Sequence, residues 1–490
     1  SNNPFGYTSP HDAYEYALNP ASSAWLCNNI YDYYLFTGDE EMLREKIYPI
    51  MREAAEALSK LLVEDPRDGS LVVAPSFSSE HGPVTVGTTY EQSLTYQLFE
   101  DVIESSVAAG ETDMEFINTL AEQKERLDPI RIGERGQIKE WREEDVVEIE
   151  DLTNSADYGG PHRHTSHLLG LYPLSMITAE TPDEFAAAKV SLEERGNAST
   201  GWSRAMKMNE WARLFDGKNA MECYSGILAE RTISNLFDTH PPLQIDGTLG
   251  LTAGVAEMLL QSHAGYVQPI PALPDEWASG SYSGLMARGN FEVGASWDED
   301  SLTEMTVLSN NGNELKIRYN EIADSTVKDS AGNEIEFTVI DDNTIGFATV
   351  EGETYTITPD QAVQSTYQVA APSEKEEADP TANAAAYSVP SGFEEMGVPD
   401  RELPISRVAL EGNDGADIRM YYDSAMGDMS FIAYGLPAEN TQAAVRVIDS
   451  SDGSVIAQQI IDVEHYSGLK ADFSVPANLE GTYELLINIV

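Results

Sequence analysis

The sequence predicts a multidomain α + β protein: a partial α/α toroid, then an antiparallel β domain, and finally a second, β-sandwich-like module. Apolar residues recur at three- and four-residue spacing as far as about residue 266, and from about 267 to 370 they alternate with polar residues. A linker over 371–399 lacks large apolar residues until Tyr387, and strand-like runs resume over 400–490. At 490 residues the chain is also too long for one hydrophobic core.

The helical half covers residues 1–266. Its clearest stripe runs from Leu43 to Leu62, and Pro49 interrupts it, so we expect a kink or a restart there. Gly110, Gly196 and Gly217 fall where helix ends or interhelix turns need them. Similar stripes occur at about 21–36, 88–109, 112–126, 182–195, 202–215, 217–236 and 250–264. Helices joined by loops with polar motifs indicate an α/α toroid. A ring of six hairpins needs twelve helices, and about eight are found, so we expect an open barrel unless further helices precede this chain.

The β half begins at about residue 267. The runs 291–297, 302–308 and 314–319 alternate as strands do, and Asn310–Asn313 is typical of a hairpin turn. In the last module, 444–448 and 455–461 flank Ser451–Gly453 and predict a second hairpin. Because the chain starts at Ser1 and ends inside a strand-like run, we expect a fragment of a longer protein.

Composition excludes several classes of function. Lys and Arg number 29 against 83 Asp and Glu, a net charge of −54, which disfavours nucleic acid and anionic membrane surfaces as partners. The sequence has no run of 18 apolar residues that would predict a membrane span, and it contains no P-loop, Rossmann or Gly-x-Ser-x-Gly motif. Cys27 and Cys223 favour two buried free thiols, with a disulfide as the alternative.

The stretch from Asp238 to Gly247, DTHPPLQIDG, is the strongest functional signal. Pro241 and Pro242 fix the backbone before Asp246, and Gly247 frees it afterwards, so we expect a rigid loop that aims a buried carboxylate into a cavity. The alternative is that Asp246 caps a helix starting at about 250.

A second acid, Glu80, lies in the loop PSFSSEHG before the helix at about 88. If apolar walls exclude water, its pKa rises and it can act as a general acid. The alternative is an ordinary loop glutamate.

Three of the eight histidines cluster around Arg163, in PHRHTSH. The donors suit sugar hydroxyls. A metal site lacks the usual helical pairing, and a structural polar network is the other alternative. Farther along, Trp202 and Trp211 offer aromatic faces to a sugar ring or belong to the core.

These motifs are part of a longer series in the same order. It comprises Phe5–Pro10, Ala24–Asn28, the three loops above, Gly201–Ser203, Thr252–His263, Leu273–Trp277 and Ala287–Val293. Together they resemble glycoside hydrolase family 95, the inverting 1,2-α-L-fucosidases, over roughly the first 370 residues. The resemblance implies an (α/α)6 barrel followed by a β domain, normally after a large N-terminal β domain, and no metal or organic cofactor.

The resemblance also implies roles for individual residues. Glu80 would protonate the departing oxygen, and Asp246 would belong to the group that activates water on the opposite face. Arg163 and His164 would hold the fucose hydroxyls, and further substrate contacts are assigned to His81, His240 and Phe5. The expected partner is a fucosylated oligosaccharide or glycan, without membrane insertion, and the expected location is extracellular or at the cell surface.

The sequence departs from the family pattern at three places. The family's water-activating Asn pair has no counterpart in Ser1–Gly6, Ser79 replaces a Pro, and Thr248-Leu249 replaces Asn-Phe. We therefore expect little or no activity from these 490 residues alone. The alternatives are an α-L-galactosidase, another α/α-toroid glycosidase or phosphorylase, and a non-catalytic glycan-binding protein.

Overall fold

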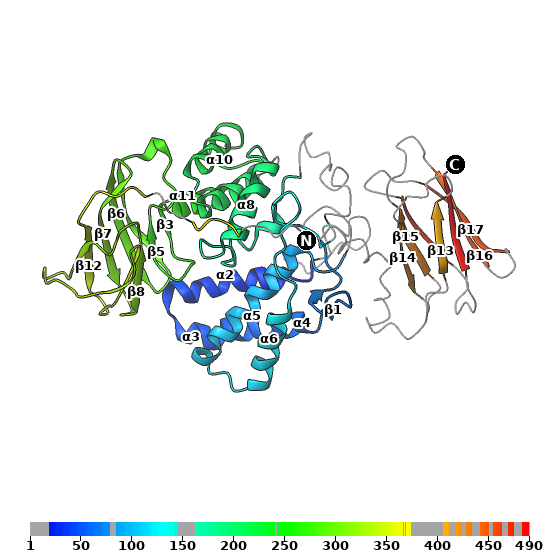
Figure 1. The fold of residues 1–490 in the computed structure, drawn as a ribbon, viewed down its shortest axis with the longest axis horizontal. Helices are drawn as coiled ribbons and strands as arrows, with labels where there is room; N and C mark the ends of the chain where they lie inside the picture. The colour runs from blue at the N-terminus through cyan, green and yellow to red at the C-terminus, as the bar shows by residue number, and fades with distance from the viewer. Residues whose placement is uncertain are drawn as a thin grey trace. The chain divides into compact units, whose positions relative to one another are not determined.

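The computed structural model describes residues 19–78, 85–142, 144, 162–240, 243–365, 367 and 369–373, and seven strands between 405 and 489. The chain divides into two compact units, one of Ser1–Ile149 with Ala156–Ala378, the other of Glu150–Ser155 with Asp379–Val490. Phe5, Glu80 and His81 lie outside the described residues. Each unit is described by itself below (Figure 1).

The first unit begins with helices. In chain order they are α2 (Ser22–Thr37), α3 (Glu40–Met42), a π-helical turn (Leu43–Ile47), α4 (Tyr48–Ser59), α5 (Thr89–Ala109), α6 (Met114–Arg126), α8 (Pro182–Arg195), α9 (Gly201–Arg213), α10 (Gly217–Glu230) and α11 (Ile245–Leu259). The side chains of Asp113 and Asp216 accept hydrogen bonds from the first turns of α6 and α10. Gly38 and Gly110 end α2 and α5 in the left-handed conformation that glycine adopts without strain.

Several helix boundaries differ from the sequence prediction. The chain stays helical from Glu40 through the π-helical turn to Ser59, so it does not restart at Pro49, and after α4 ends Leu62–Glu64 is strand β1, paired with β2 (Leu71–Val73). Helix α10 stops at Glu230 instead of about 236, and Leu236 in the following loop has φ +67°. Helix α11 begins at Ile245, about five residues before the predicted start.

Two apolar clusters hold the helices together. One lies between α2, α4, α5 and α6 and includes Met51, Leu94 and Phe99. The other lies around α8, α9 and α10 and includes Trp211. Trp211 is 2% exposed and donates to Asn197 at 2.8 Å, so it belongs to the core. Both cysteines are free and buried, which confirms the prediction of two free thiols.

The β part of the first unit has two antiparallel sheets around one apolar core. The larger has the order β5 (Gly280–Ala287), β6 (Phe291–Asp298), β7 (Ser301–Ser309), β12 (Thr354–Pro359), β9 (Ser325–Lys328), and the smaller β10 (Thr338–Asp341), β11 (Thr344–Ala348), β8 (Glu314–Arg318). The predicted hairpin at Asn310–Asn313 is wrong: β7 pairs with β6 and β12, whereas β8 pairs with β11, so this turn joins two sheets.

The β part is attached to the helices by polar contacts with α2. Arg288 pairs with Asp32 at 2.8 Å, and the N–H of Gly289 donates to the Leu35 carbonyl at 2.8 Å. A short β3 (Leu260–Gln261) and β4 (Gln268–Pro269) pair join α11 to the sheets. The helices and these sheets therefore form one body.

In the second unit the described strands form sheets of four and three. The first has the order β13 (Ile405–Leu410), β19 (Tyr483–Ile489), β16 (Gln442–Asp449), β17 (Val455–Asp462), and the second β14 (Ile418–Asp423), β15 (Asp428–Ala433), β18 (Leu469–Ser474). The pairing of β16 with β17 confirms the predicted hairpin.

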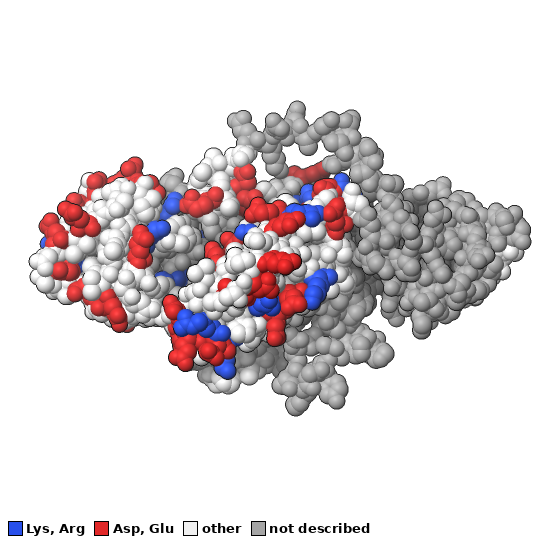
Figure 2. Space-filling model, turned by 90° about the horizontal axis from the view of Figure 1, so that it is seen from below, with Lys and Arg blue, Asp and Glu red and all other residues white. Residues whose placement is uncertain are grey.

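The acid excess is visible on the surface. Figure 2 shows Asp and Glu side chains spread over the described part of one face, with Lys and Arg in smaller groups among them. Arg44, for example, pairs with Glu40 at 2.8 Å, and both side chains are exposed. Exposed pairs of this kind contribute little to stability. Within the described residues, no helix is both long and apolar enough to cross a membrane.

Candidate active site

The first turns of three helices meet through their aromatic side chains. Trp25 of α2 lies 6.1 Å from Tyr90 of α5 and 6.3 Å from Trp202 of α9, measured between ring centroids. His164 packs edge-on against Trp202 at 5.2 Å. Both tryptophans are only half-buried. Segments far apart in the sequence thus build one aromatic wall, the kind of surface that packs on the apolar face of a sugar ring.

The histidine cluster is mostly interior. His162, His164 and His167 are buried, and only Arg163 is half-buried. The rings of His162 and His164 lie 5.1 Å apart, and Nδ1 of His164 is 3.4 Å from the Ser203 hydroxyl. His164 therefore lies against the aromatic wall, with His162 beside it, while His167 is 3.7 Å from the buried carboxylate of Glu140. Among the described residues, no group of three His, Cys, Asp or Glu side chains could hold a metal ion.

Asp246 lies on the first turn of α11, which is bonded to the start of α9. The expectation of a buried acid in a loop is wrong, because the helix has already begun at Ile245 and Asp246 is exposed. It does not cap the helix either, since the N-cap position is Gln244. The Gln244 side chain accepts a hydrogen bond from the backbone N–H of Trp202 at 2.9 Å, which ties the start of α11 to the start of α9.

A second carboxylate, Asp238, is buried behind Asp246. It is 2% exposed, and neither oxygen has a well-formed hydrogen bond among the described residues. Burial raises its pKa, the negative charge of Asp246 raises it further, and the Thr239 N–H acts in the opposite direction. Its carboxylate occupies the space that a Cβ atom at Gly201 or Gly247 would need. A larger residue at either position would therefore overlap the carboxylate.

The loop that contains Asp238 is braced from within. The Asp238 N–H donates to the Thr248 hydroxyl at 3.0 Å, and the Gln244 N–H donates to the Asp238 carbonyl at 3.2 Å. The Thr248 side chain is thus engaged inside the loop. His240 is half-buried in the same loop, where its charge lowers the pKa of Asp238.

Only the stem of the Glu80 loop is described. Ser76 and Thr85 form a two-bond antiparallel bridge, with N···O distances of 2.7 and 2.8 Å, which closes the stem. The Ser76 hydroxyl lies 2.7 Å from that of Thr88, the N-cap of α5. The stem is therefore fixed to the start of α5, and the roles of Glu80, His81 and Phe5 stay predictions.

Several buried charged groups of α5 and α9 were not recognised in the sequence. Glu91, in the first turn of α5, is fully buried, which raises its pKa to about 8. Burial likewise raises the pKa of Glu210 to about 8 and lowers that of Lys207 to about 8, although the attraction of each group for the other opposes both shifts. Periodicity gives no signal for such groups, because acidic residues on helices are usually exposed.

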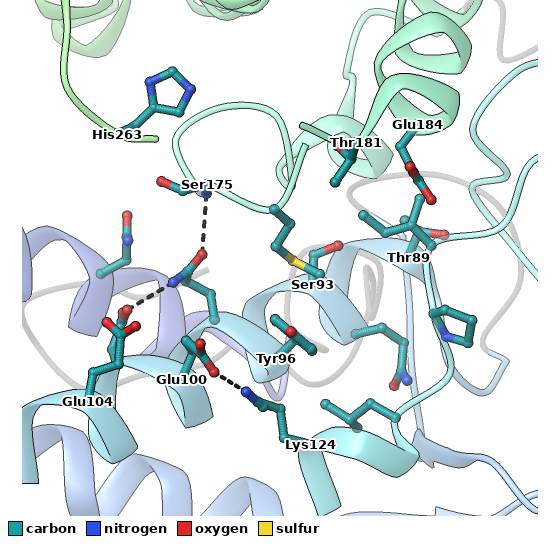
Figure 3. A pocket seen from close by; sticks show the side chains of 18 of the residues that line it. Thr89, Ser93, Tyr96, Glu100, Glu104, Lys124, Ser175, Thr181, Glu184 and His263 are labelled. Carbon is teal, nitrogen blue, oxygen red and sulfur yellow. Dashed lines mark hydrogen bonds and ion pairs between the residues drawn. The ribbon is translucent and has the colours of Figure 1, made fainter. Parts of the chain in front are cut away.

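A cavity of about 590 Å³ lies elsewhere, and none of the described candidate residues lines it. Figure 3 shows it between α5, which contributes Thr89, Ser93 and Tyr96, and the residues Thr181 and Glu184 at the start of α8. Asp246, the described member of the predicted catalytic pair, thus lies outside this cavity.

Comparisons with known proteins identify the family. The model "Glycosyl hydrolase family 95 catalytic domain" matches residues 1–259, and "Glycoside hydrolase family 95, C-terminal domain" matches residues 261–357. Alpha-L-fucosidase 2 of Arabidopsis thaliana is 34% identical over 333 residues, which are 63% of this chain and 38% of that protein. Probable alpha-fucosidase A of Aspergillus niger is 33% identical over 330 residues, 62% of this chain and 40% of that protein.

The chain spans about two fifths of the length of these curated relatives. Among solved structures, an α-L-rhamnosidase of Streptomyces avermitilis in complex with L-rhamnose has a TM-score of 0.39 at 12% identity, over 69% of this chain and 32% of that one. That likeness is too weak to assign a fold. The family models, in contrast, cover more than half of the chain, and the chain belongs to glycoside hydrolase family 95.

Proposed function

We propose that the protein hydrolyses terminal α-L-fucosyl linkages in glycans, α-1,2 linkages in particular, with inversion at the anomeric carbon. The family and the names of the two relatives support this reaction class. The observation that supports it is the contact of His164 with Trp202 at the start of α9, to which the Gln244 side chain ties the first turn of α11, the turn that contains Asp246.

The proposed reaction is a single displacement. Glu80 gives a proton to the glycosidic oxygen as the bond from that oxygen to C1 breaks, and a water molecule attacks C1 from the opposite face. The attacking water gives up its proton to the water-activating group to which Asp246 belongs, and exchange with solvent then removes that proton and reprotonates Glu80. In such a mechanism the two carboxyl groups lie about 6.5–9.5 Å apart to leave room for the water. The step balances without a metal or organic cofactor.

Substrate binding in the proposal uses the residues that the resemblance to the family assigns to it. In the proposal Arg163 and His164 donate to the hydroxyls of fucose, with His81, His240 and Phe5 as further contacts. An apolar face of the sugar packs against the aromatic wall. A neutral glycan is not repelled by a surface with a net charge of −54. The partner is then a fucosylated oligosaccharide, met outside the cell or at its surface.

The test uses the full-length gene product with 2′-fucosyllactose, followed by proton NMR. We expect β-L-fucose as the first product, and Glu80→Gln should lower kcat by about 10²- to 10⁴-fold. The matched control is Glu115→Gln, at an exposed position of α6, and this variant should keep full activity. Release of α-L-fucose first would refute inversion.

Two other outcomes distinguish the alternatives. Hydrolysis of α-L-galactosides but not of fucosides would make the protein a galactosidase, and saturable glycan binding without hydrolysis would make it a binding protein. The 490 residues alone should show little or no turnover.

A further inference from the structure

Glu140 lies buried between two segments that the proposed function uses. It is 1% exposed. Its Oε1 accepts from the hydroxyl of Ser78 and, at 3.1 Å, from that of Ser166, and the two hydroxyls are themselves 2.8 Å apart. Ser78 precedes Glu80 by two residues, and Ser166 directly follows the His162–Thr165 segment. One carboxylate oxygen therefore joins the stem of the acid's loop to the sugar-binding segment.

The other oxygen of Glu140 acts through an arginine. Oε2 accepts from Nη2 of Arg195, and Nη1 of the same guanidinium donates to the carbonyls of His162 at 3.1 Å and His164 at 2.8 Å. These two carbonyls flank Arg163 in the chain. The ion pair of Glu140 with Arg195 thus fixes the backbone from which Arg163 and His164 project.

The backbone of Glu140 is anchored as well. Its carbonyl accepts from the Thr89 N–H at 3.2 Å, its own N–H donates to the Glu144 carboxylate at 2.5 Å, and the Thr89 hydroxyl donates to the Lys139 carbonyl at 2.5 Å. Thr89 is the first residue of α5, to which the stem of the Glu80 loop is also fixed. The carboxylate is thus held in place from the side of α5.

Burying an ion pair is costly, and apolar residues of similar size usually stabilise a protein as well or better. Geometry is the benefit that such a pair provides, because a displacement of about 1 Å can cost about 10²-fold in rate. We propose that Glu140 is a positioning residue that holds the Glu80 loop and the His162–His164 segment in register, so that proton donor and sugar-binding groups meet one glycosidic bond. This inference rests on the proposed function.

The test compares Glu140→Gln and Glu140→Asp with Glu257→Gln in the full-length gene product. Gln keeps the shape of the side chain and turns an amide toward Arg195, whereas Asp keeps the charge and loses reach. Glu257 also forms a largely buried pair, with Arg213 at 2.6 Å between α11 and α9, and serves as the matched control. We expect both Glu140 variants to lower kcat for 2′-fucosyllactose by about 10- to 100-fold at temperatures well below their Tm. Glu257→Gln should change kcat less than twofold.

Hydrogen exchange gives a readout that does not need activity. Amides in the peptides containing Ser78 and His162–His167 should exchange at least about tenfold faster in Glu140→Gln than in Glu257→Gln. Unchanged exchange in both peptides, or a kcat that falls no further than in the control, would overturn the positioning role. A folded wild type that hydrolyses no α-L-fucoside would refute the proposed function, and the exchange data would still decide whether Glu140 holds the two segments.

Discussion

The buried carboxyl of Glu91 makes the stability of this protein depend on pH. The side chain is fully buried in the first turn of α5, and neither oxygen has a well-formed hydrogen bond among the described residues. Burial raises its pKa from 4.5 to about 8, against the smaller opposing effects of the Ser76 hydroxyl and the N–H groups of Phe77 and Ala21. Replacing Glu91 by Gln keeps the size of the side chain and removes the titration.

The sign of the effect follows from the two pKa values. Below pH 4.5 the carboxyl is protonated in both the folded and the unfolded chain, so its contribution is fully present. As the pH rises toward 8, the unfolded chain releases the proton and the folded chain keeps it, which favours unfolding. At roughly 1.4 kcal/mol per pKa unit, the wild type loses on the order of 3 kcal/mol between pH 5.5 and pH 8 through Glu91 alone.

Urea unfolding at pH 5.5 and pH 8 measures this loss. Asp101 and Glu210 also have raised pKa values, but they titrate equally in wild type and variant, so the difference between the two isolates Glu91. We expect Glu91→Gln to gain about 3 kcal/mol relative to the wild type on going from pH 5.5 to pH 8. The exposed control Glu115→Gln should gain nothing. Equal pH dependence in wild type and Glu91→Gln would mean that Glu91 is ionised in the folded protein, and the reasoning would fail.

Three further predictions concern the candidate site. Gly247→Ala should destabilise the protein by about 1–3 kcal/mol and lower kcat, because the new Cβ overlaps the Asp238 carboxylate; an unchanged Tm would contradict this packing. Trp202→Ala should raise the KM for 2′-fucosyllactose about tenfold, with Trp202→Phe intermediate, and an unchanged KM would remove the aromatic wall from the binding site. Asp238→Asn should keep kcat within about tenfold of the wild type, whereas Asp246→Asn should lose about 10²-fold or more; equal losses would show that both carboxylates must ionise.

Much of the fold could be predicted because the bounds of many helices depend on residues that are close together in the sequence. The three- and four-residue spacing of apolar residues predicted α8 with its observed bounds, and Gly110 ends α5 as its place in the sequence indicated. Strand partners are not local: the Asn310–Asn313 turn has hairpin chemistry, yet β7 and β8 pair in different sheets. The early start of α11 could not be predicted either, because the Gln244 side chain that braces it bonds to Trp202 of α9, 42 residues away in the sequence.

The candidate site shows the same limit. Loop chemistry drew attention to Asp246 but not to its exposure, which depends on where the helix begins. Asp238 stood in the same motif and was not recognised, because its burial depends on Gly201 from another helix. Glu140 had no sequence signal at all, since its partners Ser78, Ser166 and Arg195 come from three distant segments.

The two acids of the Asp238–Gly247 loop, Asp238 and Asp246, differ in burial and interact electrostatically. Burial raises the pKa of Asp238, and the negative charge of Asp246 acts in the same direction. Asp246 is exposed on the first turn of α11, whereas Asp238 lies buried. The Asp238 carboxyl packs against Gly201 and Gly247, and the missing Cβ atoms of these glycines let the starts of α9 and α11 approach it closely. Of the two acids, Asp246 is therefore the one that solvent reaches, and it is the one to which the proposed mechanism assigns a part in activating water.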